Sequence, residues 1–215
     1  MFAGGPDSAA RCCPVSERIA ARFLWAVEVM APRPTDRLLE IGGGPGIIVS
    51  LICPMLSSGQ IHGIDRSKPA TAHAARRNAR CVEEGRASFE AVALADADLG
   101  RGRFDTAFAI NVRLFRTDAA READVLRRGL KPKGTLYLFQ QHPSAERTRA
   151  VTEELRAALT DNGFDIQDVL TKGSGAARMT SIEAAPVSRS DAALRRSRPD
   201  RRRRTAGRPR RSAPW

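Results

Sequence analysis

Apolar residues in the middle of the chain fall into blocks of two kinds, which alternate. Short, nearly continuous apolar runs are typical of strands buried on both faces, and longer segments with apolar residues three and four apart are typical of amphipathic helices. The predicted strands are 37–41, 60–65, 88–93, 104–110, 134–140, 164–171 and 177–184. The predicted helices are 17–30, 47–57, 69–84, 118–130 and 145–162.

Strands that alternate with helices predict a mainly parallel α/β sheet with helices on both faces. Pro54 lies inside the predicted helix 47–57 and removes a backbone hydrogen bond, so we expect this helix to kink or end near Cys53. Residues 172–175, Lys-Gly-Ser-Gly, fit a hairpin connection between the last two strands. Ligands of such sheets bind beyond the carboxyl ends of the strands.

The first predicted strand runs directly into a glycine-rich turn. Residues 39–46 read Leu-Glu-Ile-Gly-Gly-Gly-Pro-Gly, and an apolar helix start follows at 47–52. Glycines allow backbone N–H groups to approach a ligand closely and permit positive φ angles. Asp65 follows at the tip of the second predicted strand. A glycine turn followed by an acid at the next strand end is how an α/β sheet holds an adenosine-containing cofactor.

These motifs resemble one family in particular. The dinucleotide fingerprint G-x-G-x-x-G needs a small residue at position 47, where this chain has Ile47, and this disfavours a nicotinamide or flavin domain. The pattern here is G-x-G-x-G. With Glu40 two residues before the first glycine, residues 39–46 resemble motif I of the class I S-adenosylmethionine-dependent methyltransferases. Residues 63–67 resemble the post-I motif, whose acid accepts hydrogen bonds from both ribose hydroxyls in that family.

The resemblance covers about residues 15–187. Residues 104–111 are similar to the fourth strand of the family, and residues 130–138 resemble its helix-turn-strand step into the fifth. The resemblance implies a Rossmann-like, doubly wound, seven-stranded and mostly parallel sheet, with helices on both faces and a final antiparallel strand. It therefore assigns residues 16–187 to a methyltransferase domain.

The resemblance also implies S-adenosylmethionine as the cofactor. In many relatives a Gly-Asp pair after strand three binds the adenine amino group, but Leu94 and Ala95 occupy those positions here. We assign the adenine contact to Asp96 and Ala97, one position later. The predicted cofactor-binding residues are Glu40, Gly42, Gly43, Gly44, Gly46, Asp65, Arg66, Asp96, Ala97 and Asn111.

Methyl transfer from a sulfonium is an in-line displacement, so alignment and a desolvated pocket matter more than a fixed catalytic triad. The candidate catalytic residues are Asn111 and His142, near the predicted ends of strands four and five. An imidazole pKa of about 6.5 suits proton removal; the alternative is that His142 is a loop histidine before Pro143. Arg113, Gln140 and Gln141 lie near the same strand ends.

The acceptor follows by elimination. Asn111 is followed by Val112 and Arg113 instead of Pro-Pro-Tyr or Pro-Pro-Phe, which argues against methylation of adenine or cytosine amino groups. We therefore expect a small-molecule acceptor. The segment 23–30 is either a lid over the site or a plain packing helix.

Charge is concentrated at one end of the 215-residue chain, whose formal net charge is +12. Residues 188–215 hold 11 arginines and two aspartates, a net charge of +9, whereas the first 187 residues carry 25 basic and 22 acidic groups, a net charge of +3. We expect residues 188–215 to be a disordered tail and residues 1–15 a mobile segment. Such a tail is suited to non-specific polyanion contact. The first alternative function is therefore a polyanion-binding protein that acts through its tail; a cofactor-binding domain without methyl transfer is the second.

Other features exclude further classes. No stretch approaches the roughly 20 apolar residues of a membrane span, and no export signal is visible, so we expect a cytoplasmic protein. The cysteines lack paired metal-site spacing, so we predict free thiols and no metal. They are Cys12, Cys13, Cys53 and Cys81.

Overall fold

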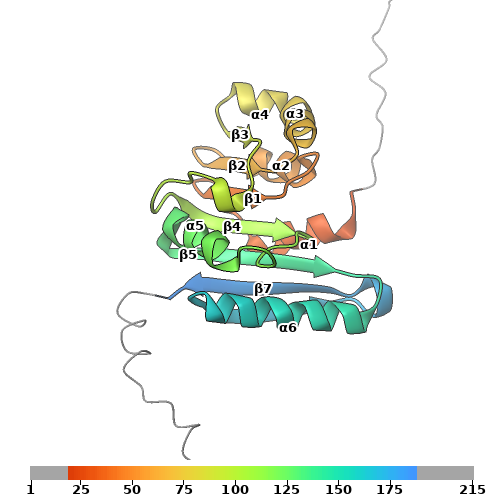
Figure 1. Ribbon diagram of the computed structural model, residues 1–215. Helices are drawn as coiled ribbons and strands as arrows, with labels where there is room; N and C mark the ends of the chain where they lie inside the picture. Colours follow the sequence, from red (N-terminus) through yellow and green to blue (C-terminus); the bar gives the residue numbers. More distant parts are fainter. Residues whose placement is uncertain (1–18, 188–215) are drawn as a thin grey trace, which may run out of the picture.

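The buried strands predicted from the sequence form one seven-stranded sheet in the computed structural model, which describes residues 19–187 (Figure 1). The order across the sheet is β3-β2-β1-β4-β5-β7-β6. β7 runs antiparallel to its two neighbours, β5 and β6, and every other pair of neighbouring strands is parallel. The strands are β1 (Arg37–Ile41), β2 (Gln60–Ile64), β3 (Ala87–Glu90), β4 (Phe104–Ile110), β5 (Leu130–Gln141), β6 (Phe164–Lys172) and β7 (Met179–Pro186). The predicted doubly wound, mostly parallel sheet is confirmed.

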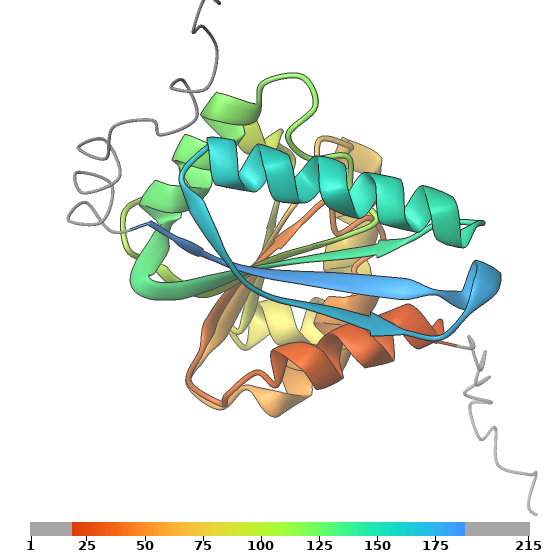
Figure 2. The same ribbon diagram turned by 90° about the horizontal axis from the view of Figure 1, so that it is seen from below.

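Helices cover both faces of this sheet, and Figure 2 shows α6 on the opposite face from α1. The helices are α1 (Ala21–Met30), α2 (Ile47–Ile52), α3 (Lys68–Arg77), α4 (Ala79–Glu83), α5 (Ala119–Gly129) and α6 (Ala145–Asp161). Short 3₁₀ turns are η1 (Cys53–Met55), η2 (Leu94–Asp96) and η3 (Gly175–Ala177). The chain order reverses between β1 and β4, so the carboxyl ends of these two strands flank the crevice where such sheets bind ligands.

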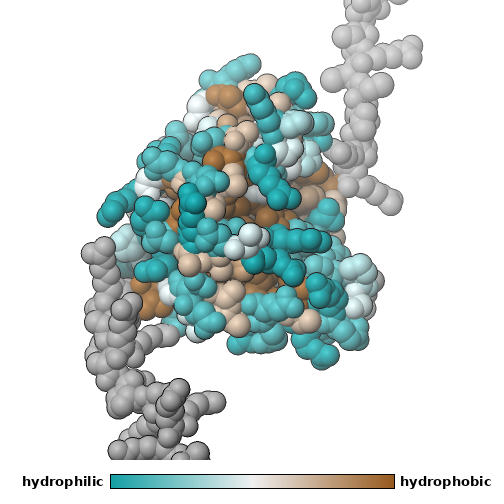
Figure 3. Space-filling view, viewed as in Figure 1, coloured by the Kyte–Doolittle hydropathy of each residue, from teal (hydrophilic) through white to brown (hydrophobic). Residues whose placement is uncertain are grey.

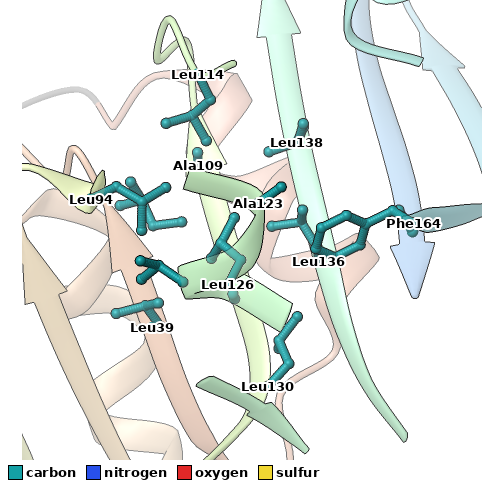
Figure 4. Close-up of a cluster of buried hydrophobic side chains, with 14 of the residues drawn as sticks. Leu39, Leu94, Ala109, Leu114, Ala123, Leu126, Leu130, Leu136, Leu138 and Phe164 are labelled. Atoms are coloured by element: carbon teal, nitrogen blue, oxygen red, sulfur yellow. The ribbon is translucent and has the colours of Figure 1, made fainter. Parts of the chain in front are cut away.

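The two faces of the sheet bury separate apolar clusters, because successive side chains of a strand point to opposite faces. Leu39 of β1 packs toward α5 and α6, in a cluster that includes Leu126 and Phe164 (Figure 4). Leu38 packs on the other face with Trp25 of α1 and residues of α2. Burial on both faces explains why these strands read as continuous apolar runs.

Several element boundaries differ from those expected. As expected from Pro54, α2 ends at Ile52 and continues only as the turn η1. The single helix expected over 69–84 is instead two, α3 and α4, which meet at Asn78. Strand β5 begins at Leu130, four residues before the predicted start, and its pairing with β4 is irregular between Phe104 and Thr106.

The expectation of free thiols is wrong for two of the four cysteines. Cys53, directly after α2, forms a disulfide with Cys81 of α4, with the two Cα atoms 6.5 Å apart. The sequence separation of 28 concealed the pair, because only the tertiary fold brings Cys53 of the turn η1 next to Cys81 of α4. Cys12 and Cys13 lie outside the described residues, as do the expected mobile segment 1–15 and the tail 188–215.

A helix that crosses a bilayer needs about 20 predominantly apolar residues. None of the helices within residues 19–187 is long and apolar enough to cross a membrane.

The disulfide predicts a redox-dependent stability. By the chain-entropy argument, closing a loop of 28 residues stabilises the folded state by about 3 to 4 kcal/mol. In oxidising buffer we therefore expect urea unfolding to show Cys81→Ser less stable than the natural chain by about that amount. With dithiothreitol present the difference should disappear. Equal stabilities in oxidising buffer would show that the bond does not form.

Candidate functional site

The glycine turn after β1 is packed so closely that side chains are excluded from it. A Cβ atom at Gly42 would lie 2.6 Å from Val112 Cγ2, and one at Gly43 would lie 2.5 Å from Glu40 Oε2. Gly42, Gly44 and Gly46 also have positive φ angles of 68°, 52° and 72°. The predicted G-x-G-x-G turn thus needs glycine for both space and conformation.

Asp65, at the end of β2, binds this turn through a hydrogen bond. Its Oδ2 accepts a hydrogen bond from the Gly44 N–H at 3.0 Å, and its Oδ1 accepts one from the Ser67 N–H at 2.8 Å. The Gly42 N–H donates to the Ile64 carbonyl at 2.7 Å. The two motifs predicted to share a cofactor are therefore in direct contact, as parallel neighbouring strands require.

Glu40 is a buried acid beside this turn. Its side chain is 4% exposed, and Oε2 has no hydrogen-bond partner within the described residues. Burial, with a smaller contribution from the charge of Asp65, raises the pKa of Glu40 to about 8. A buried carboxyl with a free oxygen fits a cofactor that brings positive charge, and S-adenosylmethionine has both a sulfonium and an ammonium.

Asn78, which the motifs of the sequence did not single out, supports the turn from the other side. The buried Asn78 Nδ2 donates to the Gly46 carbonyl at 3.0 Å and to the Ala74 carbonyl at 2.9 Å. A Cβ atom at Gly46 would lie 2.8 Å from both Ala74 Cβ and Asn78 Nδ2. The residue that divides α3 from α4 therefore also holds the glycine turn. Asparagine's preference for helix ends was the only available signal.

Three predicted cofactor residues lie outside this close packing. Asp96 is exposed and forms an ion pair with Arg121 of α5, at 2.9 Å. Ala97 is buried in the apolar core, and its N–H donates to the Leu94 carbonyl at 3.2 Å. Arg66 is exposed beside Asp65. The adenine contact assigned to Asp96 and Ala97 remains a prediction, with both groups already engaged within the protein.

A cavity of about 580 Å³ opens where β4 and β5 end, and α6 forms one wall. Asn111, the first residue after β4, lines this cavity and has a left-handed backbone conformation with φ 55°. Its Oδ1 accepts a hydrogen bond from the Gln141 N–H at 2.7 Å. Val112 lines the cavity and also packs on Gly42. The cavity, defined here as the β4–β5 cavity, therefore borders the glycine turn.

His142 lines the β4–β5 cavity at the end of β5. Its Nε2 is buried and lacks a hydrogen-bond partner within residues 19–187. Burial and the nearby Arg147 both lower the pKa of His142 below its usual 6.5. The imidazole is therefore neutral at neutral pH and can accept a proton.

The comparisons with known proteins agree with this geometry. A family model described as "Methyltransferase domain" matches residues 39–136, which include the glycine turn, Asp65 and Asn111. No curated protein matches the chain.

Similar solved structures include an S-adenosylmethionine-dependent methyltransferase from Aquifex aeolicus, at 14% identity over 77% of this chain and 89% of that one, with a TM-score of 0.66. Geranyl diphosphate methyltransferase, in complex with S-adenosylmethionine, is 15% identical over 78% and 85%, with a TM-score of 0.62. The [4+2]-cyclase SpnF is 20% identical over 77% and 81%, with a TM-score of 0.64. At these identities the structures establish the fold.

A doubly wound sheet with a glycine turn, a strand-end acid and a bordering cavity defines a nucleotide-cofactor enzyme of the Rossmann-like class. The family model matches residues 39–136 to a methyltransferase domain. The fold and this match together support an S-adenosylmethionine-dependent methyltransferase, an enzyme that takes its methyl group from S-adenosylmethionine.

Glu40 predicts a distinctive pH dependence. Its pKa is about 8 in the folded protein and about 4.5 when exposed, so the folded state binds the proton more tightly. The stability that this group contributes is present below pH 4.5 and is lost as the pH rises toward 8. Urea unfolding should show that Glu40→Gln gains about 3 to 5 kcal/mol relative to the natural chain between pH 5 and pH 9.

The exposed Glu83 provides the matched control. Glu83→Gln should follow the pH dependence of the natural chain. If Glu40→Gln also ran parallel to the natural chain, Glu40 would be ionised in the folded protein and the argument from its burial would be wrong.

Proposed function

We propose that this methyltransferase methylates a small molecule bound in the β4–β5 cavity. The observation that supports the proposal best is the shared wall: Val112 lines the cavity and packs on Gly42 of the turn assigned to the cofactor. A volume of about 580 Å³ is within the range of small-molecule sites. The solved structure named geranyl diphosphate methyltransferase indicates that this fold can act on a molecule of that size.

The protein's part in the reaction is to hold two molecules in line. S-adenosylmethionine supplies a methyl group already activated by the sulfonium charge. Gly42 to Gly46 would offer backbone to the cofactor, Asp65 would offer a carboxylate to the ribose, and Glu40 would offer a buried carboxyl to a cationic group. The apolar part of the wall of the β4–β5 cavity would pack on the acceptor and keep water from that side of it.

His142 is the proposed general base. Its neutral imidazole and unpartnered Nε2 suit removal of a proton from an acceptor that must lose one. Asn111, the other candidate, has its side-chain oxygen engaged by the Gln141 N–H. We therefore propose that Asn111 is a positioning residue, which fixes the end of β5 beside the cavity.

The alternatives receive less support. The polyanion-binding function would act through residues 188–215, which lie outside the described residues, and it stays a prediction. Cofactor binding without methyl transfer is a real alternative for this fold, because SpnF is named for a cyclase reaction. The cytoplasmic location also stays a prediction; disulfides such as that of Cys53 and Cys81 are rare in that compartment.

Methyl-labelled S-adenosylmethionine tests the proposed function. Incubated with the full chain and an extract of the producing cells, the label should pass to the low-molecular-weight fraction. Asp65→Ala should weaken cofactor binding about 10- to 100-fold, because it removes a charged hydrogen-bond acceptor, and should reduce labelling accordingly. The exposed acid Asp98 provides a matched control, and Asp98→Ala should label normally.

Two outcomes of this experiment would contradict the proposal. Label in protein or nucleic acid would show a macromolecular acceptor. Cofactor binding without any labelled product would favour the non-catalytic alternative.

The role of His142 predicts a pH profile with the labelled acceptor. Because burial and Arg147 lower the pKa of His142, the rate should stay level through the usual imidazole range and decline only at more acidic pH, where the imidazole becomes protonated. His142→Gln should lose this decline and turn over about 100-fold more slowly, with unchanged cofactor affinity. His73→Gln, on the exposed surface of α3, should keep the natural profile. A variant of His142 with full activity and the natural pH profile would exclude the base role.

A further inference from the structure

We propose that the acceptor carries an anionic group, a carboxylate or a phosphate, on an apolar body. The inference rests on the proposed function, namely that the acceptor binds in the β4–β5 cavity. Three guanidinium groups line this cavity, those of Arg113, Arg116 and Arg147, and Glu154 is the only acid among its lining residues. His142 adds no charge near neutral pH.

The three arginines come from two elements on different sides of the cavity. Arg113 and Arg116 belong to the loop that follows β4, and Arg147 belongs to the first turn of α6. Within residues 19–187, none of the three forms an ion pair. Some arginines of the neighbouring helices do, since Arg121 of α5 pairs with Asp96 and Arg156 of α6 pairs with Glu153. The cavity thus keeps positive charge that no ion pair within residues 19–187 neutralises.

The loop after β4 is held in a fixed shape. Phe115 has a left-handed backbone with φ 59°, and its N–H donates to Glu122 Oε2 of α5 at 2.5 Å. Leu114 and Phe115 are both buried. Such strain in a non-glycine residue persists only where the surroundings impose it, as at ligand sites. Anchoring of 114–115 leaves the flanking Arg113 and Arg116 exposed at the cavity.

Apolar side chains form the rest of the cavity wall. Val151, Leu155 and Ala158 lie on one face of α6, at helical spacing, and Leu114 and Phe115 add to the apolar lining. Figure 3 shows apolar patches among hydrophilic side chains on the face of the molecule that carries α5 and α6. An apolar body can pack on this wall while guanidinium groups bind its anionic end, for which their planar paired donors are suited.

Amphipathic probes test this inference in the full chain saturated with S-adenosylhomocysteine. By isothermal titration calorimetry we expect octanoate and octyl phosphate to bind at least tenfold more tightly than 1-octanol, and octylamine to bind no better than 1-octanol. The ratio between octanoate and octyl phosphate distinguishes a carboxylate acceptor from a phosphate one. The preference should weaken as salt is added, because these arginines are exposed.

Variants locate the binding. The double variant Arg113→Gln/Arg147→Gln should reduce the preference for anions to below threefold. Arg149→Gln, two residues along α6 and outside the cavity lining, should leave it unchanged. Anion binding that survives the double variant would come from elsewhere in the chain, residues 188–215 included, and would overturn the inference. So would equal binding of octanoate, octyl phosphate and 1-octanol, or no binding of either anion at millimolar concentration.

The labelled product separates this inference from the function on which it rests. If label enters small molecules that an anion exchanger retains, both are supported. If it enters small molecules that the exchanger does not retain, the anionic acceptor is wrong and the methyltransferase function stands. If no small molecule is labelled, the proposed function fails, whatever the probes show.

Discussion

Three side chains lie close against the glycine turn after β1, and the site depends on this close packing. Val112 from the end of β4, the buried carboxyl of Glu40 and the amide of Asn78 each occupy space that a side chain on the turn would need. Because Gly44 has no side chain, the Asp65 carboxylate can accept a hydrogen bond directly from the Gly44 N–H. The parallel pairing of β1 with β2 and β4 brings all of these groups to one edge of the sheet.

The same edge divides into two electrostatic environments. On the side assigned to the cofactor, Glu40 lies buried, and its Oε2 has no hydrogen-bond partner within residues 19–187, which suits a cationic ligand. On the side proposed for the acceptor, arginines from the loop after β4 and from α6 line the cavity, with one acid among the described lining residues. Val112 lies between the two sides. In the proposed arrangement, a cationic donor and an anionic acceptor would therefore bind on either side of Val112.

Strained backbone conformations occur in the loop after β4, which borders both the glycine turn and the β4–β5 cavity. Asn111 and Phe115 adopt left-handed conformations on either side of the first cavity arginine, and each is held by a hydrogen bond to another element. Ala31, after α1, is the other non-glycine residue with positive φ in residues 19–187. The loop after β4 is therefore shaped by its contacts with β5 and α5, at the expense of its own preferred conformation.

The sequence by itself determined the fold class, the order of most elements, and the pairing of the glycine turn with Asp65. Strands buried on both faces appear as continuous apolar runs, and a turn without room for side chains appears as a run of glycines. The sequence also predicted the break at Pro54 from a local signal. Only the tertiary structure decided the disulfide of Cys53, the support from Asn78 and the convergence of distant arginines on one cavity. These features depend on which segments pack against each other in the fold. Such long-range packing produces no motif of fixed spacing in the sequence, so it could not be predicted from the sequence.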